Sequence, residues 1–201
     1  SIVDYLFHGL AQGPESVASE GLATLPEAGF SSVKAYMTYD NHVDGDVLLR
    51  LLRRTKELGL LLALHAEDDA TISTLRARYR AEGKGDPVWH AASRPVRSEE
   101  EAVVRALRLA AEAGDAPLYI VHLSSAAGLA AIREARAAGQ KNVYVETCTQ
   151  YLCLTDDLYR SPVQGLRAVM SPPLRKREDI DALWEGIRNG EVQVVATDHC
   201  P

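Results

Sequence analysis

Apolar runs alternate with segments of helical spacing along the chain. Five times a helical pattern ends on a glycine, and a short apolar run rich in β-branched residues follows at 30–37, 60–64, 118–123, 143–145 and 192–196. The glycines suit the left-handed residue that ends many helices: they are Gly29, Gly59, Gly114, Gly139 and Gly190. A sixth apolar run, 2–7, opens the chain. The pattern therefore predicts six strands.

The segments between these runs predict the crossover helices. Apolar residues recur at helical spacing in 47–58, 99–113, 126–138 and 178–187. The string SEEE at 98–101 matches a capping box, so we expect a helix to begin at Ser98. Segments 83–95 and 155–173 carry glycine and proline with little periodicity, which predicts loops.

Strands that alternate with helices indicate an α/β protein with parallel pairing and right-handed crossovers. The chain, 1–201, shows one continuous domain. Six units are two short of a closed eight-stranded barrel, which takes roughly 250 residues, and a doubly wound sheet fits the same count. The pattern leaves both architectures open. The chain stops directly after a strand, which indicates truncation.

Composition excludes several classes of protein. With 22 Lys and Arg against 28 Asp and Glu, the net charge is -6, and no basic cluster offers a nucleic-acid surface. No apolar run approaches the roughly 18 residues of a membrane span, and no basic leader opens the chain. We therefore expect a cytoplasmic protein with no nucleic-acid or membrane partner. The three cysteines, Cys148, Cys153 and Cys200, predict free thiols rather than a disulfide framework.

Four residues that can bind metal or transfer protons lie in or directly after apolar strands: Lys34, His65, His122 and Asp198. Because the carboxyl ends of parallel strands meet on one face, we expect these side chains to share a site. Burial lowers the pKa of a lysine, and a neutral amine reacts with carbon dioxide to give a carbamate that can bridge two metals. Next to a metal, Asp198 can be both ligand and proton carrier.

Each of these residues also has a structural interpretation. A single histidine after an apolar run is usually a hydrogen-bonded core residue, and a strand lysine can form a salt bridge. Two histidines at equivalent strand ends favour ligands. Glu146 is either an acceptor behind the site or an ion-pair partner. The remaining histidines are interpreted as structural or surface residues: they are His8, His42, His90 and His199.

Six local strings together resemble the hydantoinase and dihydropyrimidinase family of cyclic amidohydrolases. They are VKAYMTY at 33–39, LHAE at 64–67, VHLS at 121–124, ETCTQYL at 146–152, SPPLR at 171–175 and TDHCP at 197–201. The strings run in order over nearly the whole chain, which makes the resemblance far more specific than any one of them.

The resemblance implies a TIM-like (β/α)8 barrel, of which this chain would be about strands 3 to 8. It implies two divalent metals, usually zinc, bridged by a carboxylated lysine and by hydroxide. Lys34 matches that lysine, His65 and His122 match ligands of one metal, and Asp198 matches the ligand of the other that also handles the proton. Tyr39 matches the tyrosine that stabilises the oxyanion, and Ser171 matches a substrate-contacting serine.

The implied reaction is ring opening of a hydantoin or dihydropyrimidine to an N-carbamoyl amino acid, in a homotetramer or dimer. One feature departs from the family pattern, because none of the six histidines forms a His-x-His pair. The family's first two strands, its β-sandwich and its C-terminal part are also absent, so we expect little or no activity from these 201 residues alone. The alternatives are an allantoinase or dihydroorotase, which Tyr39 disfavours, and a non-catalytic dihydropyrimidinase-like binding protein, which the four ligand-type residues disfavour.

Overall fold

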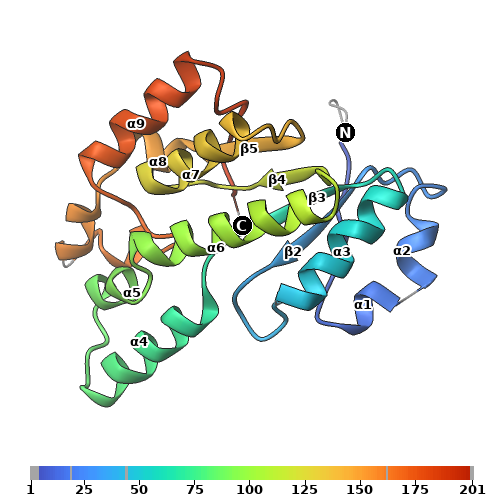
Figure 1. Cartoon of the computed structure of the whole chain (residues 1–201). Coiled ribbons are helices and arrows are strands. Elements are labelled where there is room, and N and C mark those ends of the chain that lie inside the picture. The colour runs from blue at the N-terminus through green and yellow to red at the C-terminus, as the bar shows by residue number, and fades with distance from the viewer. Residues whose placement is uncertain (1–4, 19, 44, 162, 200–201) are drawn as a thin grey trace.

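One parallel sheet organises the protein (Figure 1). The computed structural model describes residues 5–18, 20–43, 45–161 and 163–199. In these ranges the sheet has strands β1 (Gly9–Leu10), β2 (Ser32–Tyr36), β3 (Leu61–His65), β4 (Leu118–Ile120), β5 (Val143–Cys148) and β6 (Val194–Ala196). Every neighbouring pair is parallel, and the strand order follows the chain order from β1 to β6. A doubly wound sheet reverses its order, so this sheet is of the barrel type.

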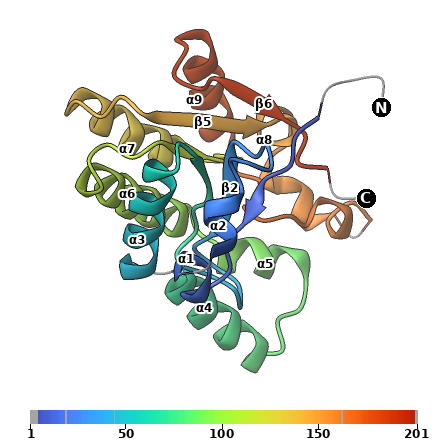
Figure 2. The ribbon, with the colours of Figure 1, turned by 90° about the vertical axis from the view of Figure 1, so that its right-hand side faces the viewer.

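Helices line one side of this sheet. The described helices are α1 (Glu15–Ala18), α2 (Glu20–Thr24), α3 (Gly45–Glu57), α4 (Asp69–Ala81), α5 (Pro87–Ser93), α6 (Val96–Glu112), α7 (Ala126–Ala137), α8 (Thr149–Cys153) and α9 (Arg177–Arg188), with 3₁₀ turns η1 (Asp156–Arg160) and η2 (Leu166–Ala168). The predicted crossovers are α3, α6, α7 and α9, and each of them packs against the next as one layer (Figures 1 and 2). Right-handed crossovers between strands in sequential order produce this one-sided layer.

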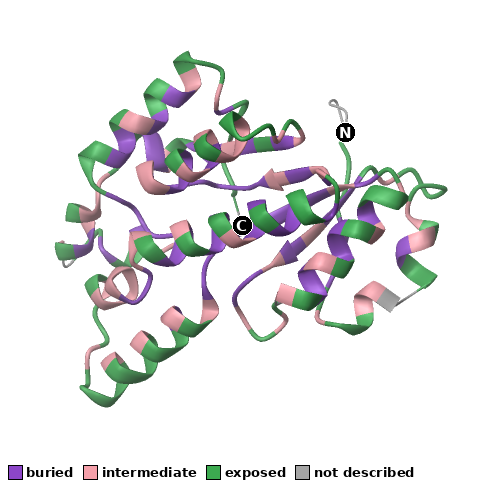
Figure 3. Ribbon diagram, viewed as in Figure 1, coloured by how far each residue is buried: buried purple, intermediate pink, exposed green. Residues whose placement is uncertain are grey.

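The two faces of the sheet differ in chemistry. In β2, Val33 and Ala35 are fully buried in the apolar core with helix residues such as Leu48. Figure 3 shows buried positions along β2 and along α3. Lys34 and Tyr36 alternate with them and are only partly buried. Since successive strand residues point to opposite faces, the apolar core lies between sheet and helices, and the polar side chains point away from it.

The predicted glycine positions are confirmed. All five glycines that precede the strands have a positive φ, between 69° and 107°. The sixth predicted strand was wrong in its place, because the described part of run 2–7 is exposed and forms no strand, and residues 1–4 lie outside the described residues. The strand is Gly9–Leu10 instead, where Gly9 lets Leu25 approach so closely that an added Cβ would lie 2.5 Å from its Cδ1.

Helices α4 and α5 are among the described helices that the sequence analysis did not predict. The segment 83–95 was predicted to be a loop, but it contains α5, which starts on Pro87, a residue that suits the first helical position. Helix α4 has one buried residue, Ile72, so it lacks the apolar stripe that marks the other helices. The loop prediction for 155–173 holds apart from the short turns η1 and η2.

The predicted capping box at Ser98 was also wrong. Helix α6 begins at Val96 after Pro95, and the Ser98 hydroxyl donates to the Pro95 carbonyl within the first turn. Glu99 points into the interior and accepts hydrogen bonds from the backbone N–H and the hydroxyl of Ser124, at 2.9 and 2.8 Å. The helix therefore starts two residues before Ser98, which lies inside the first turn and cannot cap it.

No helix in the described ranges is both long enough and apolar enough to cross a membrane.

We expect Glu99→Ala to lower the free energy of unfolding by about 3 kcal/mol, because it leaves buried donors of Ser124 and Ser125 without an acceptor. Urea unfolding followed by circular dichroism measures this loss. The control is Glu101→Ala, which removes an exposed carboxylate from the same helix and should cost less than about 1 kcal/mol. Equal losses in both variants would contradict the prediction.

Candidate active site

Strand register brings the predicted site residues to one edge of the sheet. His65 is the last residue of β3 and pairs with Tyr36 at the end of β2. His122 follows β4 by two residues, and Asp198 follows β6 by two. Lys34 lies within β2, two residues before Tyr36 and on the same face of the strand, away from the apolar core. Parallel pairing therefore gathers residues that are far apart in the sequence.

The side chains form a close cluster. The ring centroids of His65 and His122 are 4.5 Å apart, edge to face, and the Tyr39 ring lies 5.2 Å from His65. The Lys34 ammonium nitrogen is 5.2 Å from the centroid of the Tyr36 ring, which itself packs 5.8 Å from His65. The structure thus brings together Lys34, both histidines and Tyr39.

Backbone strain concentrates at this cluster. Among the described residues, four that are not glycine have a positive φ, and three of them are predicted site residues: Tyr39 at 77°, His122 at 40° and Asp198 at 49°. The fourth is Asp115, in the turn before β4. Such conformations cost of order 1–3 kcal/mol each and persist where the surroundings enforce them, commonly at functional sites. No sequence pattern revealed this strain.

Burial sets the protonation of the cluster. It lowers the pKa of Lys34 to about 8, against the opposing charges of Asp198 and Glu146. The pKa values of His65 and His122 fall well below the usual value, chiefly because both are buried. Lys34 is the next cause at His65, whereas at His122 it is His65, followed by Lys34. Both imidazoles are therefore neutral at pH 7, the form that binds metals.

The imidazole nitrogens fit a metal. Nδ1 of His122 is buried and has no hydrogen-bond partner among the described residues. Nε2 of His65 lies 2.8 Å from a Glu67 carboxylate oxygen, and Arg94 binds that same oxygen. A carboxylate on one ring nitrogen, as at His65, is a usual arrangement for a metal-ligating histidine, and the unpartnered Nδ1 of His122 offers a free donor.

The described residues nevertheless contain no cluster of three or more His, Cys, Asp or Glu side chains placed to hold a metal ion. Asp198 is exposed, although its charge acts on Lys34. The donor set that the structure does assemble is two imidazoles and one amine. Conversion of that amine to a carbamate would add oxygen donors to the set.

Glu146 serves as an acceptor, one of the two roles expected for it. Its carboxylate accepts from the Tyr119 hydroxyl at 2.6 Å and from the backbone N–H of His122 at 3.1 Å. The second bond holds His122 in its strained conformation. Sequence analysis missed Tyr119, Glu67 and Arg94 as supporting residues. Tyr119 and Arg94 act through tertiary contacts, and the Glu67 contact with His65, two residues away, has no distinctive sequence pattern.

Ser171 lies near Tyr39 and contributes to its environment. Burial raises the pKa of the Tyr39 phenol, while the Arg94 charge and a hydrogen bond with the Ser171 side chain lower it. The Arg94 guanidinium carbon is 5.4 Å from the centroid of the Tyr39 ring.

Among the other histidines, His90 contacts Met170 and Ser171, whereas the remaining three lie outside the cluster. His8 bonds the Ser32 hydroxyl and His42 bonds the Tyr39 carbonyl, both at 2.7 Å, and His199 is exposed. Free thiols are confirmed at Cys148 and Cys153, and Cys200 lies outside the described residues.

The fold and this cluster define a barrel-type α/β protein with its candidate site at the carboxyl ends of the strands. No protein-family model matches the chain. The chain is 45% identical over 200 residues to the D-phenylhydantoinase of Escherichia coli O9:H4 (strain HS). The matched region covers 100% of this chain and 43% of that protein. D-hydantoinase from Bacillus sp. AR9 superimposes with a TM-score of 0.93 at 39% identity, and dihydropyrimidinase from Brevibacillus agri NCHU1002 with 0.93 at 40%.

Each of these structures covers 100% of this chain and is covered over 44% of its own length. The chain is therefore a relative of the hydantoinases and dihydropyrimidinases, and it spans less than half the length of the curated relatives it matches. Its six strands correspond to part of their barrel, which confirms the expected fold class.

Lys34 should destabilise the metal-free protein. Its pKa of about 8 in the folded state lies below the ordinary value of 10.5, so folding disfavours protonation of the amine. The resulting loss of folding free energy is complete below pH 8 and disappears above pH 10.5. We expect Lys34→Met to raise the free energy of unfolding at pH 7 by up to about 3 kcal/mol in chelated, bicarbonate-free protein, with the gain shrinking toward pH 10. Urea unfolding across this pH range measures it.

Lys141→Met is the matched control, because Lys141 is exposed and its substitution should change stability by under about 0.5 kcal/mol at every pH. A loss of stability in Lys34→Met at pH 7 would contradict the interpretation of Lys34 as a buried, unfavourably charged amine.

Proposed function

We propose that the protein represented by this chain is a metal-dependent cyclic amidohydrolase that opens hydantoin or dihydropyrimidine rings to N-carbamoyl amino acids. One observation carries the proposal: two neutral, buried imidazoles lie 4.5 Å apart at the strand ends, beside a lysine with a lowered pKa. The similarity to D-phenylhydantoinase and dihydropyrimidinase supports the choice of substrate class.

The residues that would hold two divalent metal ions, with zinc the first candidate, are Lys34, His65, His122 and Asp198. The Lys34 amine attacks carbon dioxide, forms the C–N bond of a carbamate and releases one proton. The carbamate provides two oxygen donors that share one negative charge. A metal bound there supplies Lewis-acid activation of water and of the ring carbonyl.

The remaining chemistry belongs to side chains of this chain. The Tyr39 hydroxyl donates to the charge that develops on the ring carbonyl oxygen, and the Ser171 segment holds the cyclic amide. Asp198, exposed at the strand end, accepts a proton and returns it to the departing ring nitrogen. Glu67 fixes the ring of His65 through the 2.8 Å contact to Nε2.

These 201 residues alone are expected to show little or no turnover, because they contain no His-x-His pair to complete the second metal site. We place the activity in a longer chain that assembles as a dimer or tetramer. Its localisation in the cytoplasm is part of the proposal.

The decisive test is metal content and turnover of the full-length protein, purified with zinc and bicarbonate. We expect two metals per chain, ring opening of hydantoin or dihydrouracil in preference to allantoin or dihydroorotate, and loss of both metal and turnover in Lys34→Ala. Lys141→Ala should retain both. Preferred turnover of allantoin or dihydroorotate would select a different cyclic amidohydrolase, and a metal-free full-length protein would favour a binding protein.

Tyr39→Phe should lower kcat of the full-length enzyme by about 100-fold with little change in KM, because an oxyanion donor acts in the transition state. Steady-state kinetics with hydantoin measures the split. Tyr79→Phe, on α4 and packed against Trp89, is the control and should leave both constants unchanged. A rise in KM with unchanged kcat would show that Tyr39 only binds substrate.

A further inference from the structure

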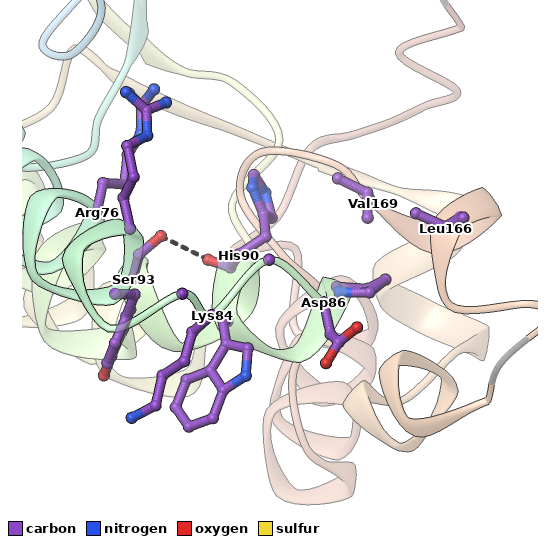
Figure 4. Close-up of a pocket in the computed structure, with 13 residues that line it drawn as sticks. Arg76, Lys84, Asp86, His90, Ser93, Leu166 and Val169 are labelled. Carbon is purple, nitrogen blue, oxygen red and sulfur yellow. Dashed lines mark hydrogen bonds between the residues drawn. The ribbon is translucent and has the colours of Figure 1, made fainter.

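His90 connects helix α5 to the segment that carries Ser171. Its Nε2 lies 2.9 Å from the Met170 carbonyl oxygen and 3.4 Å from the Ser171 hydroxyl oxygen. The Ser93 hydroxyl donates to the His90 carbonyl at 2.7 Å, which fixes the backbone of α5 at this point (Figure 4). The ring thus contacts two successive residues that are 80 and 81 positions further along the chain.

The chemistry of these partners assigns the protons. A carbonyl oxygen can only accept, so Nε2 of His90 must carry the hydrogen that it shares with Met170. The same N–H therefore also donates to the Ser171 hydroxyl oxygen, which acts as an acceptor. Burial lowers the pKa of His90, so the ring is neutral near pH 7 and this is its only N–H.

The hydrogen of the Ser171 hydroxyl is then free to point elsewhere. Tyr39 is a hydrogen-bond partner of this side chain. Because the Ser171 oxygen already accepts from the His90 N–H, the Ser171 hydrogen is available to donate to the phenol oxygen. With its oxygen accepting from Ser171, Tyr39 must direct its own hydrogen outward. The result is a one-way relay of donors from His90 through Ser171 to Tyr39.

We propose that His90 is a positioning residue of the active site, whose Nε2–H, held by the Met170 carbonyl, orients Ser171 and through it the Tyr39 hydroxyl toward the substrate carbonyl. This inference rests on the proposed function, in which Tyr39 is the oxyanion donor. His90 itself touches no reacting atom. It sets the direction of the Tyr39 hydroxyl, which lies two steps further along the relay.

A pocket gives access to His90 from outside. Its volume is about 450 Å³, and its lining includes Arg76, Tyr79, Trp89, His90 and Val169 (Figure 4). A side chain shortened at position 90 would leave a void that opens into this pocket. Free imidazole can therefore reach the vacated position, which makes chemical rescue feasible.

The test compares variants of the full-length zinc enzyme with hydantoin as substrate. We expect His90→Ala to lower kcat about tenfold, the effect of one lost hydrogen bond, with KM changed less than about threefold. His90→Gln keeps a donor at the reach of Nε2 and should stay within about threefold of the parent in kcat. Free imidazole should restore part of the lost kcat in His90→Ala and none in the parent.

Coupling separates positioning from a structural role. In a Ser171→Ala background, His90→Ala should cause no further loss of kcat, because the relay is already broken. Independent losses that multiply would overturn the proposal. Arg80→Ala, an exposed residue of α4 that lines the same pocket, is the matched control and should leave kcat unchanged. If His90→Ala fails to fold, His90→Asn provides the loss variant, since its shorter amide cannot reach Met170.

Crystal structures decide the positioning claim without any need for turnover. In His90→Ala or His90→Asn the Ser171 hydroxyl should turn away from Tyr39, and in His90→Gln it should stay. An unmoved Ser171 in the loss variants overturns the proposal. The two proposals can also fail separately. If Ser171 moves as expected but the full-length protein opens no cyclic amide, the role of His90 is supported and the proposed function is refuted.

Discussion

Buried charge pairing behind the strand ends is the constraint on which the site depends. Arg94 binds the buried Glu67 carboxylate, which in turn contacts His65. Arg175 donates to the Arg94 carbonyl at 2.7 Å and to the Ser124 hydroxyl at 3.0 Å, and Ser124 donates to the buried Glu99. Two carboxylates and two guanidiniums therefore balance one another. Removal of any one would leave an uncompensated buried charge, which typically costs 3–5 kcal/mol.

This network holds loops that come from distant parts of the chain, and it lets the site keep unfavourable features. Three strained residues and a lysine that resists its proton all reduce stability at the strand ends. The apolar layer between the sheet and helices α3, α6, α7 and α9 offsets these costs from the opposite face of the same strands. Stability and chemistry are thus divided between the two faces of one sheet, because alternate strand residues point in opposite directions.

Periodicity located the elements that bury an apolar stripe and missed those that do not. The strands after the five glycines, and the four helices of the layer, carry their burial pattern in the sequence. Helix α4 buries only Ile72, and α5 sits in a segment rich in glycine and proline, so neither had a signal in the hydrophobic pattern. The cap at Ser98 failed for another reason: the helix begins earlier, at Val96 after Pro95, so Ser98 lies within its first turn.

The sequence by itself determined which residues carry chemistry, since Lys34, His65, His122 and Tyr39 follow or interrupt apolar runs in recognisable strings. It also determined that the strands are parallel, because each is followed by a helical crossover. Only the tertiary structure decided between a barrel-type and a doubly wound sheet, which differ in strand order and not in local pattern. It alone assigned His90, Glu67 and Arg94 to the site, because hydrogen bonds between residues 27 to 81 positions apart leave no periodic trace in a sequence.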